Sequence, residues 1–254
     1  SRQVDVDLVE VFVTVTVGRS MRFFEVGGCV RDQLMGLTSK DVDFAVEAES
    51  FEAMEAELKA RGFKIYLSTP ELLTIRAQVP ASEEKLRARS KDADFVLCRK
   101  DSTGSDGRRP DYVEAGTILD DLARRDFTMN AIAIDVATGA VLDPHGGIND
   151  IKRNLLKFVG DPYKRINEDG LRVLRGLRFL ITKGLQAEME TGDALMSFDA
   201  HKMLMKVSIE RVREELEKMF AYDTTVAMEL LHGYPNLLPS IFREGLRLMP
   251  TLKT

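Results

Sequence analysis

The sequence predicts an α+β protein whose first half mixes strands with helices and whose second half is helical. Two observations indicate this class. Up to about residue 145, short apolar segments with the period of β-strands alternate with turn residues and helical segments. After Gly146-Gly147, apolar residues recur at helical spacing almost to the end of the chain. This segregation along the chain is typical of an α+β arrangement, with the divide near residues 145–160.

Strands are expected throughout the first half. Residues 4–17 alternate with period two, apart from a slip near Leu8–Val9. A second strand over Arg22–Val26 runs directly into Gly27-Gly28. Because Met21 could be the natural start, we treat residues 1–20 as an N-terminal extension. The remaining predicted strands are Val42–Val46, Phe63–Leu67, Leu72–Ala77, Ala93–Cys98, Ala131–Asp135 and Val141–Asp143.

Helices are expected at two places in the first half and in most of the second. A short helical segment is predicted over Val30–Met35. Ser50 and Gly62 are typical cap residues, and they bound a predicted helix over Phe51–Arg61. The predicted helices of the second half are Asp150–Leu155, Asp169–Lys183, Ser208–Phe220, Thr224–Leu231 and Leu237–Leu248.

Composition excludes several classes of protein. With 44% hydrophobic and 30% charged residues, the chain can bury a core and is not a disordered protein. Its uncharged apolar runs are far shorter than the roughly 18 residues of a membrane span, and we expect neither a secretory leader nor a membrane partner. The cysteines, Cys29 and Cys98, are therefore expected as free thiols in the cytoplasm. A net charge of −5 argues against nucleic-acid binding by bulk charge, but not against a local basic site.

The first chemical motif combines two glycines with acidic residues about ten positions further on. Gly27 and Gly28 end a strand and let the backbone approach a ligand closely, and Arg31 adds a cation that can bind phosphate oxygens. Asp41 and Asp43 lie two apart on a predicted strand, so both carboxylates should point to one face. Two carboxylates beside a phosphate site favour Mg²⁺, and a pair of such ions could support an in-line displacement. Either motif alone is usually only a turn or a solvated strand face.

Two further segments could contribute to the same site. Asp94 lies on a predicted strand that could neighbour Val42–Val46, where it would help to hold a metal or deprotonate a hydroxyl. Arg124 and Arg125 enter another strand and could bind a triphosphate or a ribose. The alternatives are an exposed strand carboxylate and surface ion pairs, which contribute little stability.

A helical motif offers a means of reading a base. Asp169 and Arg172 are predicted three residues apart on one helix and hence neighbours, a spacing that often gives only an ion pair. A carboxylate only accepts hydrogen bonds and an arginine only donates them. The pairing edges of cytosine and adenine offer an amino donor beside a ring-nitrogen acceptor, whereas uracil and guanine offer the opposite order. The pair would therefore accept C and A and refuse U and G.

Together these segments resemble the bacterial–eukaryotic (class II) tRNA nucleotidyltransferase and poly(A) polymerase family. The resemblance runs from about Met21 to Phe220 in the family's order and spacing. It lies in the segments GGCVRD, KDVDF, RRDFTMNAIAID, LDPHGGINDIKRN, FVGDPYKRINEDGLRVLRGLRF and SIERVREEL. It implies a polymerase-β-like nucleotidyltransferase head, a mixed sheet with flanking helices, followed by an all-helical neck and a truncated body. The expected ranges are 21–145 for the head, 146–222 for the neck with its base-recognition helix, and 223–254 for the partial body.

The resemblance also implies residue roles. Asp41 and Asp43 match the family's metal-binding aspartates. Asp94 matches a third catalytic acidic residue that is commonly Glu, so this chain departs from the family by one methylene. The expected nucleotide-binding residues are Gly27, Gly28, Arg31, Arg125, Asp169, Arg172, Arg175 and Arg178.

The implied activity is template-independent addition of C, C and A to the 3′ end of tRNA by two-metal nucleotidyl transfer, with CTP, ATP and Mg²⁺. The polar, glycine-rich segment Arg99–Asp111 lies where family members that add the full CCA carry a flexible loop. Three alternatives stay open: addition of CC or A alone, poly(A) synthesis, and a non-catalytic RNA- or nucleotide-binding fragment.

Overall fold

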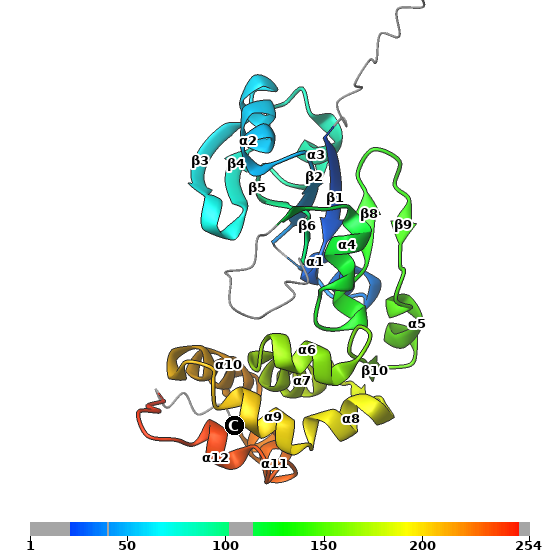
Figure 1. Cartoon of the computed structure of the whole chain (residues 1–254). Coiled ribbons are helices and arrows are strands. Elements are labelled where there is room, and N and C mark those ends of the chain that lie inside the picture. The colour runs from blue at the N-terminus through cyan, green and yellow to red at the C-terminus, as the bar shows by residue number, and fades with distance from the viewer. Residues whose placement is uncertain (1–20, 40, 102–113, 249–254) are drawn as a thin grey trace, which may run out of the picture.

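The computed structural model describes residues 21–39, 41–101 and 114–248. The predicted strand over residues 4–17 and the N-terminal extension lie outside these residues. Figure 1 shows a part built on a β-sheet above a part built of helices, and the predicted α+β class with a mixed sheet is confirmed. We call the segment from Met21 to Leu142 the sheet part and the segment from Gly147 to Leu248 the helical part.

A seven-stranded sheet forms the centre of the first part, with the strand order β3-β4-β5-β2-β1-β8-β9. Its only parallel neighbours are β2 and β5, and the other paired strands are antiparallel, so the sheet is mixed. The strands are β1 (Arg22–Val26), β2 (Asp43–Glu47), β3 (Lys64–Thr69), β4 (Thr74–Gln78), β5 (Asp92–Leu97), β8 (Ala133–Asp135) and β9 (Val141–Leu142).

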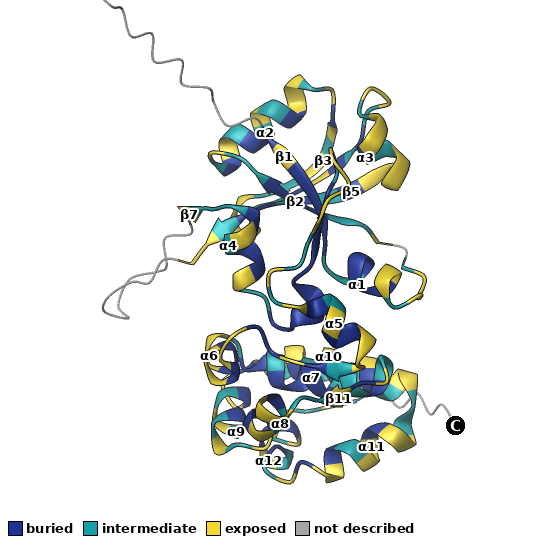
Figure 2. Ribbon diagram, turned by 90° about the vertical axis from the view of Figure 1, so that its right-hand side faces the viewer, coloured by how far each residue is buried: buried dark blue, intermediate teal, exposed yellow. Residues whose placement is uncertain are grey.

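Helices pack on both faces of the sheet. Because neighbouring residues of a strand point to opposite sides, a single strand contributes side chains to the cores on both faces. Phe23 of β1 packs in a core with α2, whereas Phe24 packs on the other face with α4. Figure 2 shows the central strands buried between these helices. The helices of the sheet part are α1 (Gly28–Leu34), α2 (Phe51–Ala60), α3 (Glu84–Arg89) and α4 (Ile118–Ala123), with the 3₁₀ turns η1 (Pro70–Leu72) and η2 (Thr128–Asn130).

Two local predictions in the sheet part meet different outcomes. The helix predicted over Phe51–Arg61 is confirmed as α2, and the Ser50 hydroxyl caps it by accepting from the Ala53 N–H at 3.0 Å. The start of the predicted loop Arg99–Asp111 is instead a short strand, β6 (Arg99–Lys100), paired with β7 (Glu114–Ala115). The rest of that loop lies outside the described residues.

The helical part contains eight described helices and one short strand pair. The helices are α5 (Gly147–Lys152), α6 (Pro162–Glu168), α7 (Leu171–Thr182), α8 (Met189–Leu195), α9 (Phe198–Leu204), α10 (Ile209–Tyr222), α11 (Thr224–His232) and α12 (Leu238–Ile241). The strands β10 (Leu155–Leu156) and β11 (Gln186–Ala187) pair in parallel, so the prediction of an entirely helical second half is wrong at this point. Among the described helices, none is long and apolar enough to cross a membrane.

The helix predicted over Asp169–Lys183 is wrong at its start. The preceding helix α6 ends at Glu168, Asp169 has an extended backbone (φ −154°, ψ 108°), and α7 begins at Leu171. The spacing of apolar residues does not locate this break, because apolar residues recur at helical spacing both before and after Asp169. Likewise, of the predicted helix Leu237–Leu248 the described residues contain only α12.

One hydrophobic core joins the two parts. Val30 of α1 and Phe127 of the sheet part pack in the same cluster as Leu174 and Leu177 of α7. The change of secondary structure near residue 146 therefore does not coincide with a break in the core. The domain limits 21–145, 146–222 and 223–254 stay a prediction.

Gly170 sets the junction between α6 and α7. A Cβ atom there would lie 2.1 Å from the carbonyl oxygen of Met203 in α9, although the backbone angles of Gly170 (φ −62°, ψ −22°) suit any residue. We expect Gly170→Ala to lower the free energy of unfolding in urea by about 2–3 kcal/mol through this overlap. Gly192→Ala is the matched control, because its Cβ would meet nothing closer than 3.6 Å. The control should be neutral or stabilising by up to about 1 kcal/mol, and equal losses in both variants would contradict the overlap.

Candidate active site

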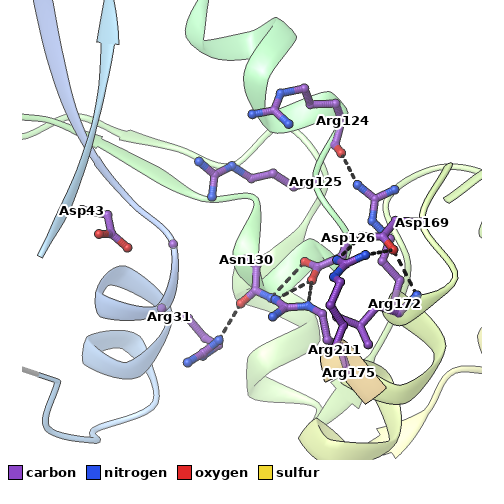
Figure 3. A pocket seen from close by; sticks show the side chains of 13 residues that line it. Arg31, Asp43, Arg124, Arg125, Asp126, Asn130, Asp169, Arg172, Arg175 and Arg211 are labelled. Atoms are coloured by element: carbon purple, nitrogen blue, oxygen red, sulfur yellow. Dashed lines mark hydrogen bonds and ion pairs between the residues drawn. The ribbon is translucent and has the colours of Figure 1, made fainter. Parts of the chain in front are cut away.

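A cavity of about 470 Å³ opens where the sheet part meets the helical part. Its wall comes from the turn after β1, the start of β2, the segment after α4 and the starts of α7 and α10 (Figure 3). Most of its side chains are charged, as expected for a site that binds a charged ligand. The lining residues are Gly27, Gly28, Arg31, Asp43, Arg124, Arg125, Asp126, Asn130, Asp169, Leu171, Arg172, Arg175 and Arg211.

The glycine turn lies against the acidic strand, as the motif predicts. In the antiparallel pair β1–β2, Val26 is opposite Asp43, so Gly27 follows directly beside that carboxylate. Gly27 has a left-handed backbone (φ 76°), and a Cβ there would lie 3.7 Å from the Asp43 Oδ2 and 3.8 Å from the Arg125 Nη1. The turn therefore leaves the space between a carboxylate and a guanidinium open to a ligand.

Of the three predicted acidic residues, two lie on neighbouring strands of the sheet and one lies before its predicted strand. Asp43 of β2 is directly opposite Asp94 of the parallel strand β5, so the predicted neighbourhood of these strands is confirmed. Asp41, however, precedes β2 and is not on the strand with Asp43. Asp94 forms an ion pair with Arg76 of β4 at 3.2 Å. Within the part of the chain that the structure describes, no three acidic, His or Cys side chains are grouped to hold a metal ion.

The surroundings of Asp43 nevertheless fit a cation. Burial raises the pKa of the Asp43 carboxyl above its usual value, and the neighbouring charges of Asp94 and Asp41 raise it further, while Arg125 opposes them. The ionised form of Asp43 is therefore disfavoured by burial and by its acidic neighbours, and the charge of Arg125 compensates for this only in part. Carboxylate oxygens are the ligands that Mg²⁺ prefers, so the donor set is compatible with that ion at Asp43 and Asp41.

The arginines nearest the glycine turn are held in fixed positions. Arg31 is buried, and its guanidinium donates to the Asp32 carboxylate at 2.9 Å and to the Asn130 Oδ1 at 2.8 Å. Arg124 and Arg125 both pair with the buried Asp121, at 2.9 and 3.0 Å. Fixed guanidinium groups of this kind lose little freedom when they bind an anion.

Asp169 and Arg172 both line the cavity, and they do not form the ion pair that their spacing often gives as the alternative to base reading. The Asp169 carboxylate accepts two bonds from Arg211 of α10, at 2.9 and 3.2 Å. The Arg172 guanidinium instead pairs with Glu168 at 2.7 Å and donates to the backbone carbonyl of Arg124 at 3.0 Å. The reason is the break at Asp169, which removes this residue from the helix of Arg172.

Arg175 and Arg178 have different surroundings. Arg175 lines the cavity and donates to the buried Asp126 carboxylate at 2.8 and 3.0 Å. Burial would raise the pKa of Asp126, but the charge of Arg175 and the bonds from Asn130 outweigh burial and hold that pKa below its usual value. Arg178 is not among the lining residues of the cavity, and it pairs with the buried Glu215 at 2.5 Å.

Sequence reasoning missed three charged or polar residues of the wall. Asp126 follows Arg125 in the RRD segment, and its place directly beside the two arginines was the available signal. Asn130 lies four residues further along and links Asp126 to Arg31. Arg211 lies in the segment SIERVREEL, but its spatial relation to Asp169 could not be read from spacing, since 42 residues separate them.

A second, larger cavity of about 800 Å³ adjoins the first. The two share four wall residues, Arg124, Asp169, Arg172 and Arg211. Four further cationic side chains line the second cavity, namely Arg99, Lys100, Lys164 and Arg165. Its wall also carries four acidic residues, Asp101, Asp120, Glu168 and Asp169, so cationic side chains exceed acidic ones in this cavity, which continues from the site.

Comparisons with known proteins show the family to which the chain belongs. The family described as "Poly A polymerase head domain" matches residues 23–157. The CCA-adding enzyme of Lactobacillus helveticus (strain DPC 4571) is 36% identical over 195 residues, which are 76% of this chain and 45% of that protein. That of Enterococcus faecalis (strain ATCC 700802 / V583) is also 36% identical, over 76% of this chain and 44% of its own. The chain thus spans less than half the length of these relatives.

Solved structures show the same fold. The Bacillus stearothermophilus CCA-adding enzyme in complex with CTP has a TM-score of 0.72 and 30% identity, over 89% of this chain and 51% of that one. A tRNA nucleotidyltransferase complexed with a primer tRNA and an incoming ATP analog has a TM-score of 0.66 and 27% identity, over 90% of this chain and 61% of its own.

The half-buried carboxylate of Asp43 and the buried carboxylate of Asp126 should affect stability in opposite directions. The raised pKa of Asp43 means that its charge destabilises the fold fully above that raised value and not at all below the ordinary one. We therefore expect Asp43→Asn to raise the free energy of unfolding at pH 7, and the gain to shrink as the pH falls towards the ordinary carboxyl pKa. Urea titrations across this pH range measure it.

The matched variant is Asp126→Asn. Its lowered pKa means that its stabilisation is present above the ordinary carboxyl pKa and is lost as the pH falls through the folded-state value. We expect a loss of roughly 3 kcal/mol at pH 7, because Arg175 loses its partner. A loss in both variants at pH 7 would contradict the assignment for Asp43.

Proposed function

Because the chain belongs to the poly A polymerase head domain family, we propose that it transfers CMP and AMP from CTP and ATP to the 3′ end of tRNA. One observation carries this proposal. A single cavity is lined at one side by the glycine turn and Asp43, and at the other by Asp169 and Arg172. The first set suits a triphosphate and the second suits a base. The relatives named CCA-adding enzyme, and the solved complexes of relatives with CTP or with a primer tRNA, support the same activity.

In the proposed reaction, the 3′-hydroxyl of the RNA attacks the α-phosphorus of the bound nucleotide, and pyrophosphate leaves. Arg31 and Arg125 would hold the phosphates, and the open space at Gly27 would let them approach the backbone. Asp41 and Asp43 would hold divalent cations. Such ions would supply electrostatic stabilisation of the developing negative charge. Asp94, beside Asp43 on the sheet, is the candidate third carboxylate, although its ion pair with Arg76 engages it in this structure.

Base selection would use Asp169 as acceptor and Arg172 as donor. Burial would raise the pKa of Asp169, but the bonds from Arg211 and the Leu171 N–H, together with nearby positive charge, hold it below its usual value. Asp169 therefore stays an ionised acceptor at neutral pH. The contacts of Arg172 with Glu168 and the Arg124 carbonyl orient its donors in the same way. We propose that the base is read by two side chains that are oriented separately, rather than by one mutual pair.

The RNA would be held locally rather than by overall charge. The adjoining basic cavity carries Arg99, Lys100, Lys164 and Arg165 next to the base-reading residues. Phosphate groups of an RNA strand are the ligands that such a surface suits. This local site reconciles RNA binding with a net charge of −5.

The first test is a matrix of nucleotides and acceptors. We expect the chain to add C to tRNA that ends in the discriminator base or in one C, and A to tRNA that ends in CC, with Mg²⁺ present. Addition of only C or only A would restrict the activity accordingly, and a long ladder of A would identify a poly(A) polymerase. The double variant Asp41→Ala, Asp43→Ala should abolish incorporation, and undiminished incorporation would refute the metal assignment.

The second test concerns base selection. Arg172→Ala should reduce the preference for CTP and ATP over UTP and GTP by roughly tenfold to a hundredfold, because the two-bond contact to the base loses its donor half. Competition between labelled nucleotides measures the preference. Arg61→Ala is the matched control, since Arg61 also pairs with a glutamate (Glu83, 2.6 Å) but does not line the cavity. Unchanged discrimination in Arg172→Ala would refute its role.

A further inference from the structure

Three guanidinium groups surround one buried aromatic ring. Phe179 of α7 is only 2% exposed, and it is not among the lining residues of either cavity described above. The Cζ atoms of Arg31, Arg175 and Arg178 lie 5.1, 5.3 and 4.5 Å from the centre of its ring. These distances are within the range in which a cation is attracted by the face of an aromatic ring.

Each of these arginines has its own carboxylate partner, so the ring is not needed to neutralise them. Arg31 pairs with Asp32 at 2.9 Å, Arg175 with Asp126 at 2.8 Å and Arg178 with Glu215 at 2.5 Å. The partners belong to three different places in the fold, α1, the segment after α4, and α10. In the part of the chain that the structure describes, the Phe179 ring is a group that all three guanidiniums share.

Two of the three, Arg31 and Arg175, line the first cavity and come from different parts of the molecule. A chain of hydrogen bonds also links them. Arg31 donates to the Asn130 Oδ1 at 2.8 Å, Asn130 donates to the Asp126 Oδ1 at 3.0 Å, and Arg175 donates to the Asp126 Oδ2 at 2.8 Å. Two separate sets of contacts therefore fix the position of Arg31 relative to Arg175, namely this chain of hydrogen bonds and the shared Phe179 ring.

We propose that Phe179 is a positioning residue that holds Arg31 and Arg175 as a preorganised pair for the phosphate groups of the incoming nucleotide. The carboxylates of Asp32 and Asp126 neutralise the two guanidiniums, and the attraction of each guanidinium to the shared ring face restricts where it can lie. A pair held in place before binding loses less freedom when the phosphates arrive. The inference rests on the proposed function, because it takes the ligand of this cavity to be a nucleoside triphosphate.

The experiment must separate the face of the ring from its volume. Phe179 also packs edge to face against Phe127 at 5.8 Å, so a truncated side chain would disturb the core. We therefore choose phenylalanine analogues with one, two or three fluorine atoms at position 179. Fluorine withdraws charge from the ring face while the size of the side chain stays nearly constant. Phe158 is the matched control, since it is fully buried and packs on Phe127 at 4.6 Å. Within the described residues, no cation lies over the Phe158 ring.

The measurements are equilibrium affinities for CTP and for inorganic pyrophosphate, with kcat and KM for CMP addition and a melting temperature for each protein. With three fluorines at position 179, we expect both affinities to fall together by roughly fivefold, in steps that follow the number of fluorines. The value of kcat should change less than KM. The same series at position 158 should leave both affinities unchanged.

Two results would overturn the inference: equal effects at positions 179 and 158, or a loss of CTP affinity without a loss of pyrophosphate affinity. The proposed function is judged separately, by whether the unsubstituted chain incorporates nucleotides at all. A chain that binds CTP but incorporates nothing would refute the function, while the affinity series would still decide the role of Phe179.

Discussion

The buried carboxylate of Asp126 is the interaction on which the arrangement of the site depends. One oxygen accepts from Asn130 and from the Phe127 N–H, at 3.0 and 2.7 Å, and the other accepts from Arg175 of α7. Asn130 in turn fixes Arg31 of α1. A single charge in a poorly solvated position thus joins the sheet part to the helical part at the point where the cavity forms. Without it, Arg175 would be left without its carboxylate partner, at high energetic cost.

Asp43 shows the opposite balance. Hydrogen-bond donors and the charge of Arg175 lower the pKa of the Asp126 carboxyl, whereas burial and the neighbouring carboxylates raise the pKa of the Asp43 carboxyl. The surroundings of Asp126 favour its ionised form, whereas those of Asp43 disfavour it. In the proposed function, a divalent cation bound at Asp43 would supply the positive charge that its ionised form lacks.

The break between α6 and α7 decides how Asp169 and Arg172, the proposed base-reading residues, are held. With an extended backbone at Asp169 and close packing of Gly170 against α9, the Asp169 carboxylate turns to Arg211 of α10. The Arg172 guanidinium donates instead to the Glu168 carboxylate and to the backbone carbonyl of Arg124. The two side chains line one cavity but are oriented by different neighbours. In the proposed function, each side chain would therefore be oriented before a base binds, without competition from the other.

The sequence by itself determined the α+β class, the glycine turn beside the acidic strand, and the family. These features follow from local periodicity and from residues close together in the chain, such as Gly27 and Arg31. Only the tertiary structure decided where α7 begins, which partners Asp169 and Arg172 have, and that Phe179 lies among three arginines. Periodicity is the same on both sides of the break at Asp169. The decisive ion pairs, Asp169 with Arg211 and Arg175 with Asp126, join residues 42 and 49 positions apart, a relation that local spacing does not encode.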